Sequence, residues 1–141
     1  MKTPKEKSNE RKRSYRNWQR RVLAISWITY ASFYLCKANI GATLPEIHKS
    51  LNSNPIAVSG IPASFKFVYG IGQFINGQIG DHVNTKYLVT LGMVGSVLVN
   101  LFFGFGTTLS FLVILWAING LFQSTGWPPF VKILANWFPT S

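Results

Sequence analysis

The stretch Ser32–Asn39, with the sequence SFYLCKAN, decides the fold because it places a lysine inside an apolar run. Between Val22 and Leu44 the only charged side chain is Lys37. A transmembrane helix needs about 20 mostly apolar residues, so this run is long enough to cross a bilayer. A lysine near the middle of a span costs at least about 2.5 to 3.5 kcal/mol and persists where it faces a protein interior or a water-filled cavity. The run therefore predicts a membrane protein with a polar pathway.

The composition of the whole chain indicates the same class. Charged residues make up 13% of the sequence and hydrophobic residues 48%, whereas soluble domains are usually about 25% charged. Nine of the 14 Lys and Arg precede Val22, and the residues from Val22 onward carry only seven charged groups. So few charges are insufficient to solvate the outside of a soluble globule. The modest mean hydropathy of +0.19 averages a polar N-terminus with a very apolar body.

The basic N-terminus allows three interpretations. A nucleic-acid site would interleave basic and aromatic residues on a folded platform, and Tyr15 and Trp18 are the only aromatic candidates. A signal peptide would have an apolar core of about 7 to 15 residues, which is shorter than the run that follows here. Lys and Arg beside a first span hold that end in the cytoplasm. We therefore expect no nucleic-acid partner and a mobile, basic cytoplasmic tail over residues 1–21.

Four apolar segments predict an all-α integral membrane protein, with a partial transmembrane bundle over residues 22–141. The expected spans cover residues 22–44, 58–80, 87–106 and 110–137. Pro45 should end the first span, and residues 46–54 should form an external loop. The second is rich in glycine, which membrane helices tolerate because small residues let backbones approach. The motif Gly126–Pro129 should kink the fourth.

The loop charges and the basic tail predict the orientation. Four crossings return the chain to the side on which it began, and the positive-inside rule places that side in the cytoplasm. We therefore expect a multi-pass protein of the cell membrane (inner or plasma) with a cytoplasmic N-terminus.

Small and polar residues recur on one face of the third span. Four of them lie four residues apart: Gly92, Ser96, Asn100 and Gly104. In a helix this spacing places them on the same side. Since small residues let membrane helices pack closely, the pattern predicts a tight helix contact there.

The second span carries a charge of its own, Lys66. From the helical rise, Lys37 lies about four residues beyond the middle of an outward span and Lys66 about three before the middle of a returning one. Both ammonium groups should therefore lie roughly 5 Å from the bilayer centre on the same side. Two cations that face each other in a low dielectric repel strongly unless an anion lies between them or one loses its proton. This predicts an anionic ligand.

Polar and aromatic residues share helical faces with these lysines. These candidates for contact with a phosphate or carboxylate come from the first, second and fourth spans: Tyr30, Tyr34, Lys37, Lys66, Tyr69, Gln73, Asn76, Asn119, Gln123 and Trp127. Their hydroxyl, amide and ammonium groups are the donors that such an anion needs. The alternative for the amides is hydrogen bonding between helices. For Gln73 and Asn119 both interpretations stay open.

The sequence offers no arrangement typical of an enzyme. No set of nucleophile, base and orienting residue occurs, and two His, one Cys and one Asp are too few for a metal cluster. The glycines of residues 70–77 have the wrong spacing for a dinucleotide loop. We therefore expect neither catalytic residues, nor a metal site, nor a cofactor.

Three motifs, in order along the chain, resemble those of a known family. The segment Gly77–Lys86, GQIGDHVNTK, looks like the signature loop of the major facilitator superfamily. Its Asp-x-x-Asn form, with Phe33–Asn39 before it and Phe122–Pro129 after it, is similar to the organophosphate:phosphate antiporters. These include glycerol-3-phosphate and hexose-phosphate transporters and a related sugar-phosphate sensor. The resemblance covers about residues 15 to 141.

The resemblance implies a twelve-helix rocker-switch exchanger that takes up an organic phosphate ester in exchange for inorganic phosphate. It implies substrate-binding roles for Lys37, where the family has arginine, for Tyr30, and for Trp127 on the fourth helix. A lysine of the glycerol phosphate transporter falls on Gln73. The conformational-switch loop falls on Gly77, Gly80, Asp81, His82 and Lys86, with His82 in place of the usual arginine. Lysine in place of arginine leaves a point charge without a bidentate fork.

The length of the chain sets a further expectation. Transporters of this type bind substrate between two six-helix halves, and this chain ends after about four helices. We expect a truncated N-terminal fragment that is inactive alone, with the lipid bilayer, a phosphate ester, inorganic phosphate and the remainder of the transporter as partners. The alternative function is a membrane sensor that binds a sugar phosphate and signals to a membrane partner. A third possibility is an inserted polypeptide without activity.

Overall fold

The computed structural model describes residues 4–138, which form helices joined by short links. The elements are α1 (Pro4–Ala38), α2 (Ile40–Ser50), α3 (Pro55–Val58), α4 (Gly60–His82), α5 (Thr85–Phe103), α6 (Leu109–Ser124) and α7 (Trp127–Trp137). The first three residues of the expected tail and the last three of the chain lie outside the described part. Within residues 4–138 there is no strand, so the all-α prediction is confirmed.

Two segments of the described chain are long and apolar enough to cross a membrane. They are Thr85–Phe103, with 19 residues, and Leu109–Trp137, with 29 residues. They coincide with the third and fourth predicted spans. The break between α6 and α7 confirms the predicted kink, since a proline stands in the first turn of α7. The first and second predicted spans are helical, but their charged, amide and glycine residues lower their mean hydropathy. The prediction of four membrane-spanning helices therefore stays a prediction.

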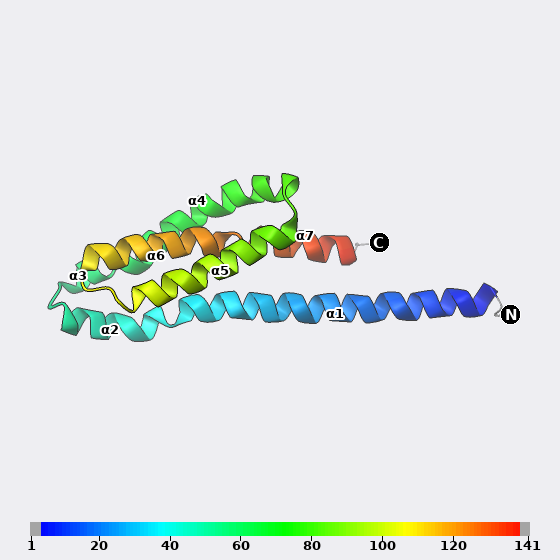
Figure 1. The fold of residues 1–141 in the computed structure, drawn as a ribbon, viewed down its shortest axis with the longest axis horizontal. Coiled ribbons are helices and arrows are strands. Elements are labelled where there is room, and N and C mark those ends of the chain that lie inside the picture. The colour runs from blue at the N-terminus through cyan, green and yellow to red at the C-terminus, as the bar shows by residue number, and fades with distance from the viewer. Residues whose placement is uncertain (1–3, 139–141) are drawn as a thin grey trace.

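The N-terminal residues form a helix, whereas the sequence predicted a mobile tail. Helix α1 is 35 residues long and has no glycine or proline after Pro4, and its Lys, Arg and Glu residues favour helix. Contacts with α7 support it: the Gln19 Nε2 donates to the Trp137 carbonyl at 2.7 Å, and the Tyr15 and Trp137 rings stack with centroids 5.8 Å apart. The basic segment is therefore an extension of the first helix, which projects past α7 (Figure 1).

The first helix breaks earlier than the sequence predicted. A break at Asn39 separates α1 from α2, and α2 continues through Pro45 to Ser50. Proline removes one backbone hydrogen bond and kinks a helix. The turns before and after Pro45 are still helical. The prediction that Pro45 ends the helix is therefore wrong, and the link that follows consists of residues 51–54. Asn54 ends that link by accepting a hydrogen bond from the Ile56 N–H at 2.9 Å, which caps α3.

Glycines let α6 pack closely against α4 and α5, and Figure 1 shows it between them. A Cβ at Gly120 of α6 would lie 2.6 Å from the Phe65 carbonyl oxygen of α4, and one at Gly92 of α5 would lie 2.7 Å from the Phe122 carbonyl oxygen of α6. The tight face predicted on α5 is confirmed for Gly92 and Ser96, which are both buried. Gly104 is exposed at the end of α5 instead.

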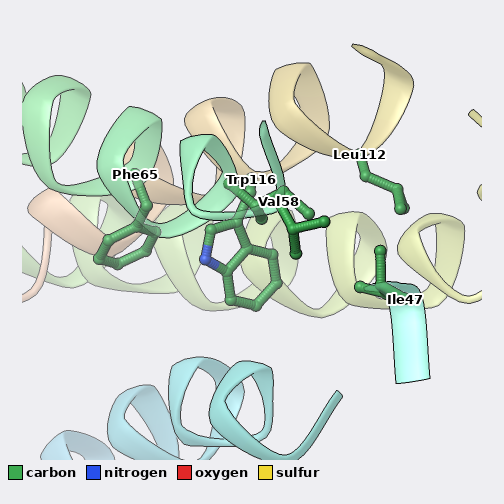
Figure 2. Packing of buried hydrophobic residues seen from close by; sticks show 6 residues of the cluster. Ile47, Val58, Phe65, Leu112 and Trp116 are labelled. Atoms are coloured by element: carbon green, nitrogen blue, oxygen red, sulfur yellow. The ribbon is translucent and has the colours of Figure 1, made fainter. Parts of the chain in front are cut away.

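An apolar cluster closes the end of the bundle near α2 and α3. Its buried members are Ile47, Val58, Ile61, Phe65, Leu112 and Trp116. Figure 2 shows the Trp116 indole between Phe65 and Val58, with Ile47 and Leu112 farther along. This cluster ties α2, α3, α4 and α6 together beside the cavity described below.

Candidate functional site

Lys37 lies in the last turn of α1, where the free carbonyl groups of a helix end favour a cation. Its Nζ lies 4.8 Å from the ring centroid of Tyr34 and 5.9 Å from that of Tyr69 on α4. Aromatic faces attract ammonium groups by about 0.5 to 1 kcal/mol at exposed sites and by more when water is excluded. The half-buried Lys37 side chain is therefore directed toward α4 and the interior of the bundle.

The predicted pair of lysines meets in one cavity. This outer cavity, of about 360 Å³, lies between α1, the start of α2, α4 and α6. Its lining residues are Tyr34, Lys37, Ala38, Ile40, Pro62, Phe65, Lys66, Tyr69 and Trp116. Lys66 is exposed on the α4 side of the cavity. Lys37 and Lys66 therefore line the same cavity, while their shared depth in the membrane stays a prediction.

A smaller inner cavity, of about 20 Å³, adjoins the first through Tyr34, Lys37 and Tyr69. Six of the predicted contact residues line it: Tyr30, Tyr34, Lys37, Tyr69, Gln123 and Trp127. Aromatic rings pack against one another beside it, since the Tyr30 centroid lies 5.8 Å from that of Trp127 and 5.4 Å from that of Phe130. The structure therefore brings together residues from α1, α6 and α7 that are about 90 positions apart in the chain.

The remaining amide candidates bond within the bundle. Gln73 Nε2 donates to the Tyr69 hydroxyl at 2.9 Å, so it acts on a residue that lines both cavities. Asn119 is fully buried and accepts from Ser96, and Asn76 donates to Ser124 at 2.7 Å. Neither asparagine lines the two cavities. These contacts agree with the alternative of interhelical hydrogen bonding for both asparagines.

Neither cavity is lined by a carboxylate. The acidic residues of the described chain are Glu6, Glu10, Glu46 and Asp81, and none belongs to either lining. Two ammonium groups at one cavity without a carboxylate produce a positive potential that favours an anion. The tyrosine hydroxyls supply further hydrogen-bond donors. The site can therefore bind a phosphate or carboxylate group by charge and hydrogen bonds.

The sequence did not identify the apolar wall of the outer cavity. Phe65 and Trp116 form that wall, with ring centroids 5.9 Å apart, and Phe65 stacks on Tyr69 at 5.6 Å. A signal was present, because Phe65 and Tyr69 are four residues apart on the face that carries Lys66. Trp116 lies one turn before Asn119 and could have been found in the same way.

The predicted conformational-switch loop is largely helical. Asp81 and His82 belong to the last turn of α4, and Lys86 belongs to the first turn of α5, so the link consists of Val83 and Asn84. Helix continues through Asp81 because α7 supports it. The Lys132 Nζ of α7 lies 3.2 Å from the Asp81 Oδ1 and donates to the Gly80 carbonyl at 3.0 Å.

These residues surround a cavity of their own against α7, of about 220 Å³. Gly77, Gly80 and Asp81 line it together with Lys132, while His82 and Lys86 are exposed outside it. The Asp81–Lys132 pair is exposed to solvent, where such pairs contribute about 0 to 1 kcal/mol. The switch role therefore stays a prediction for all five residues.

The sequence matches the family model of the Major Facilitator Superfamily over residues 26–141, which is most of the chain. The chain belongs to this superfamily. As a major facilitator chain it is a membrane protein of a transporter family, in agreement with its two apolar spans. The resemblance to organophosphate:phosphate antiporters is also confirmed, as its relatives show.

Three relatives of this major facilitator chain carry informative names. It is 29% identical over 130 residues to the "Probable hexose phosphate transport protein" of Chlamydia trachomatis, which covers 92% of this chain and 28% of the relative. It is 33% identical over 124 residues to the "Membrane sensor protein UhpC" of Salmonella typhimurium, and this match covers 88% of this chain and 28% of the relative. It is 42% identical over 80 residues to "Sugar phosphate exchanger 3" of Gallus gallus, and this match covers 52% of this chain and 16% of the relative. The chain thus spans about 28% of the length of the first two relatives. No solved structure matches it significantly.

Proposed function

We propose that this major facilitator chain supplies an anion-binding part of a secondary transporter that exchanges an organic phosphate ester for inorganic phosphate. The observation that carries the proposal is the outer cavity, in which Lys37 and Lys66 meet without a carboxylate. The relatives named for hexose phosphate and sugar phosphate support a phosphate ester as the anion. The proposal includes no enzymatic step, because this set of residues offers charge and hydrogen bonds but no activated nucleophile.

The two halves of the proposed substrate fit two kinds of surface in the outer cavity. The phosphate group interacts with the ammonium groups of Lys37 and Lys66 and accepts hydrogen bonds from tyrosine hydroxyls. Hydrogen bonds to charged groups contribute about 1.5 to 3 kcal/mol each. The apolar face of a sugar ring packs on the wall formed by Phe65 and Trp116. Since lysine offers a point charge and not a fork, the aromatic wall is needed to orient the ester.

The membrane arrangement is part of the proposal. The N-terminus lies in the cytoplasm, since the extension of α1 carries most of the basic residues. The protein crosses the plasma membrane four times within these residues. Further helices complete a cavity between two halves of the transporter, because the named relatives are much longer than this chain. The chain alone binds its ligand but does not transport it.

A second candidate function is a membrane sensor for a sugar phosphate. The 33% identity to a relative named as a membrane sensor protein favours it. A sensor would use the same cavity, because recognition of the anion needs the same charges. The two functions differ in whether bound ligand crosses the membrane.

The binding step can be tested on the chain in lipid nanodiscs by equilibrium dialysis against radiolabelled glucose 6-phosphate. We expect saturable binding that unlabelled inorganic phosphate displaces and that neutral glucose does not, because the lysines recognise the phosphate group. Lys66→Met should weaken the binding about tenfold, which corresponds to about 1.4 kcal/mol. Displacement by glucose at the same concentration as by phosphate would contradict the proposal.

A further inference from the structure

A buried chain of hydrogen bonds lies behind the inner cavity and joins three helices. Its members are Ser96 of α5 and Asn119 and Gln123 of α6, with exposed fractions of 0%, 0% and 4%. The Ser96 hydroxyl donates to the Asn119 Oδ1 at 2.6 Å. The Gln123 Nε2 donates to the Ser96 Oγ at 2.9 Å and to the Phe33 carbonyl of α1 at 2.9 Å. Both amide hydrogens of Gln123 are therefore used on neighbouring helices.

The Phe33 carbonyl connects this chain of bonds to Lys37. In an α-helix the carbonyl of residue 33 is the acceptor for the backbone N–H of residue 37. The bond from Gln123 therefore ties α6 to the turn of α1 that carries Lys37. That turn is the last one of α1, because the helix breaks at Asn39. A contact from outside the helix is thus well placed to fix the position of the Lys37 ammonium.

Packing alone does not account for an amide at position 119. The Asn119 Nδ2 is buried and has no hydrogen-bond partner, and such a donor is costly in a low dielectric. A leucine, which branches at the same atom, would carry no such unpaired donor. What leucine would lack is the Asn119 Oδ1, the acceptor for the Ser96 hydroxyl. With its hydrogen directed to Asn119, the Ser96 oxygen offers its lone pairs to Gln123.

We propose that Ser96 and Asn119 are positioning residues for the anion site. They hold the Gln123 amide on the Phe33 carbonyl and thereby hold the last turn of α1 where Lys37 faces both cavities. Neither residue lines the inner or the outer cavity, so they act through Gln123 and not on the ligand. This inference rests on the proposed function, since it concerns the affinity of that same site.

The test is exchange of glucose 6-phosphate by the complete transporter in proteoliposomes. Ser96→Ala should raise the KM about tenfold and leave the maximal rate within about twofold, because Lys37 is present but less well placed. Asn119→Leu should raise the KM in the same way. Ser96→Thr, which restores the hydroxyl, should keep a KM close to that of the unchanged protein.

Ser124→Ala is the matched control. Ser124 is also fully buried, and its hydroxyl bonds to the amide of Asn76 between α4 and α6, with no link to Phe33. It should lower the melting temperature about as much as Ser96→Ala does, while the KM stays unchanged. Equal increases of KM in both alanine variants would overturn the proposal, because the effect would then follow from loosened packing.

A comparison with Lys37→Ala separates this inference from the proposed function. Loss of exchange in Lys37→Ala together with an unchanged KM in Ser96→Ala and Asn119→Leu would overturn the positioning role alone. Unchanged exchange in Lys37→Ala would overturn the proposed function and the positioning role together.

Discussion

Lys37→Ala is expected to reduce exchange of glucose 6-phosphate by the complete transporter to the background of empty proteoliposomes. The substitution removes the ammonium group that both cavities share. Hydrogen bonds to charged groups contribute about 1.5 to 3 kcal/mol, so the loss of this group corresponds to roughly ten- to hundredfold weaker binding. The remaining Lys66 would face the phosphate from α4 only. Uptake of radiolabelled ester into phosphate-loaded proteoliposomes measures the effect.

The control for this substitution is Lys49→Ala. Lys49 lies on α2, where its exposed Nζ is 3.5 Å from the Glu46 Oε1, outside both cavities. Exposed pairs of this kind contribute about 0 to 1 kcal/mol, so exchange should continue at its normal rate. Lys37→Arg should keep part of the activity because it keeps the charge. Normal exchange in Lys37→Ala would mean that the anion is bound elsewhere.

Gly120→Ala is expected to disrupt the packing of α6 on α4. An added Cβ would lie 2.6 Å from the Phe65 carbonyl oxygen and 3.3 Å from the Phe65 Cα. These are backbone atoms, so the two helices must separate, and overpacking of this kind costs about 1 to 3 kcal/mol or more. Since Phe65 lines the outer cavity, binding of the ester should weaken as well. Thermal unfolding in detergent, followed by circular dichroism, measures the loss of stability.

Gly70→Ala provides the comparison, because it is also a helical glycine of the bundle. A Cβ at Gly70 would meet nothing within 4 Å, and alanine favours helix over glycine by about 1 kcal/mol. The melting temperature of this variant should stay the same or rise. A Gly120→Ala protein as stable as the Gly70→Ala protein would show that the close contact between α4 and α6 contributes little.

The sequence predicted the all-α class and indicated that Lys37 and Lys66 share one cavity. Both follow from local rules: apolar length identifies a span, and the rise per residue converts position into depth. Tyr30, Tyr34, Gln123 and Trp127 line one inner cavity, and their contact with a ligand stays a prediction.

The sequence failed where a distant helix decides the local structure. The residues before Val22 read as a tail because they lack apolar periodicity, yet Tyr15 and Gln19 contact Trp137 on α7. Asp81 read as a loop residue, but Lys132 supports it at the end of α4. The helix breaks at Asn39, where the sequence has no helix-breaking residue, and it continues through Pro45, where the sequence has one. No spacing rule relates these partners, since more than 50 positions separate them.

The roles of the buried amides depended on packing in the same way. Asn119 could serve the ligand or the neighbouring helix by its position alone. Its contact with Ser96 follows from Gly92, one turn earlier, which lets α5 approach α6 closely. To choose between these two roles, one must know the distance between α5 and α6. The spacing of residues along one helix does not give that distance.

Counterflow of radiolabelled glucose 6-phosphate tests the central claim most directly. The complete transporter is reconstituted in proteoliposomes loaded with inorganic phosphate, with labelled ester outside. We predict transient accumulation of label that depends on internal phosphate and is absent from the Lys37→Ala protein. Binding of labelled ester without any accumulation would identify a sensor, and accumulation that is independent of both internal phosphate and Lys37 would contradict exchange through this cavity.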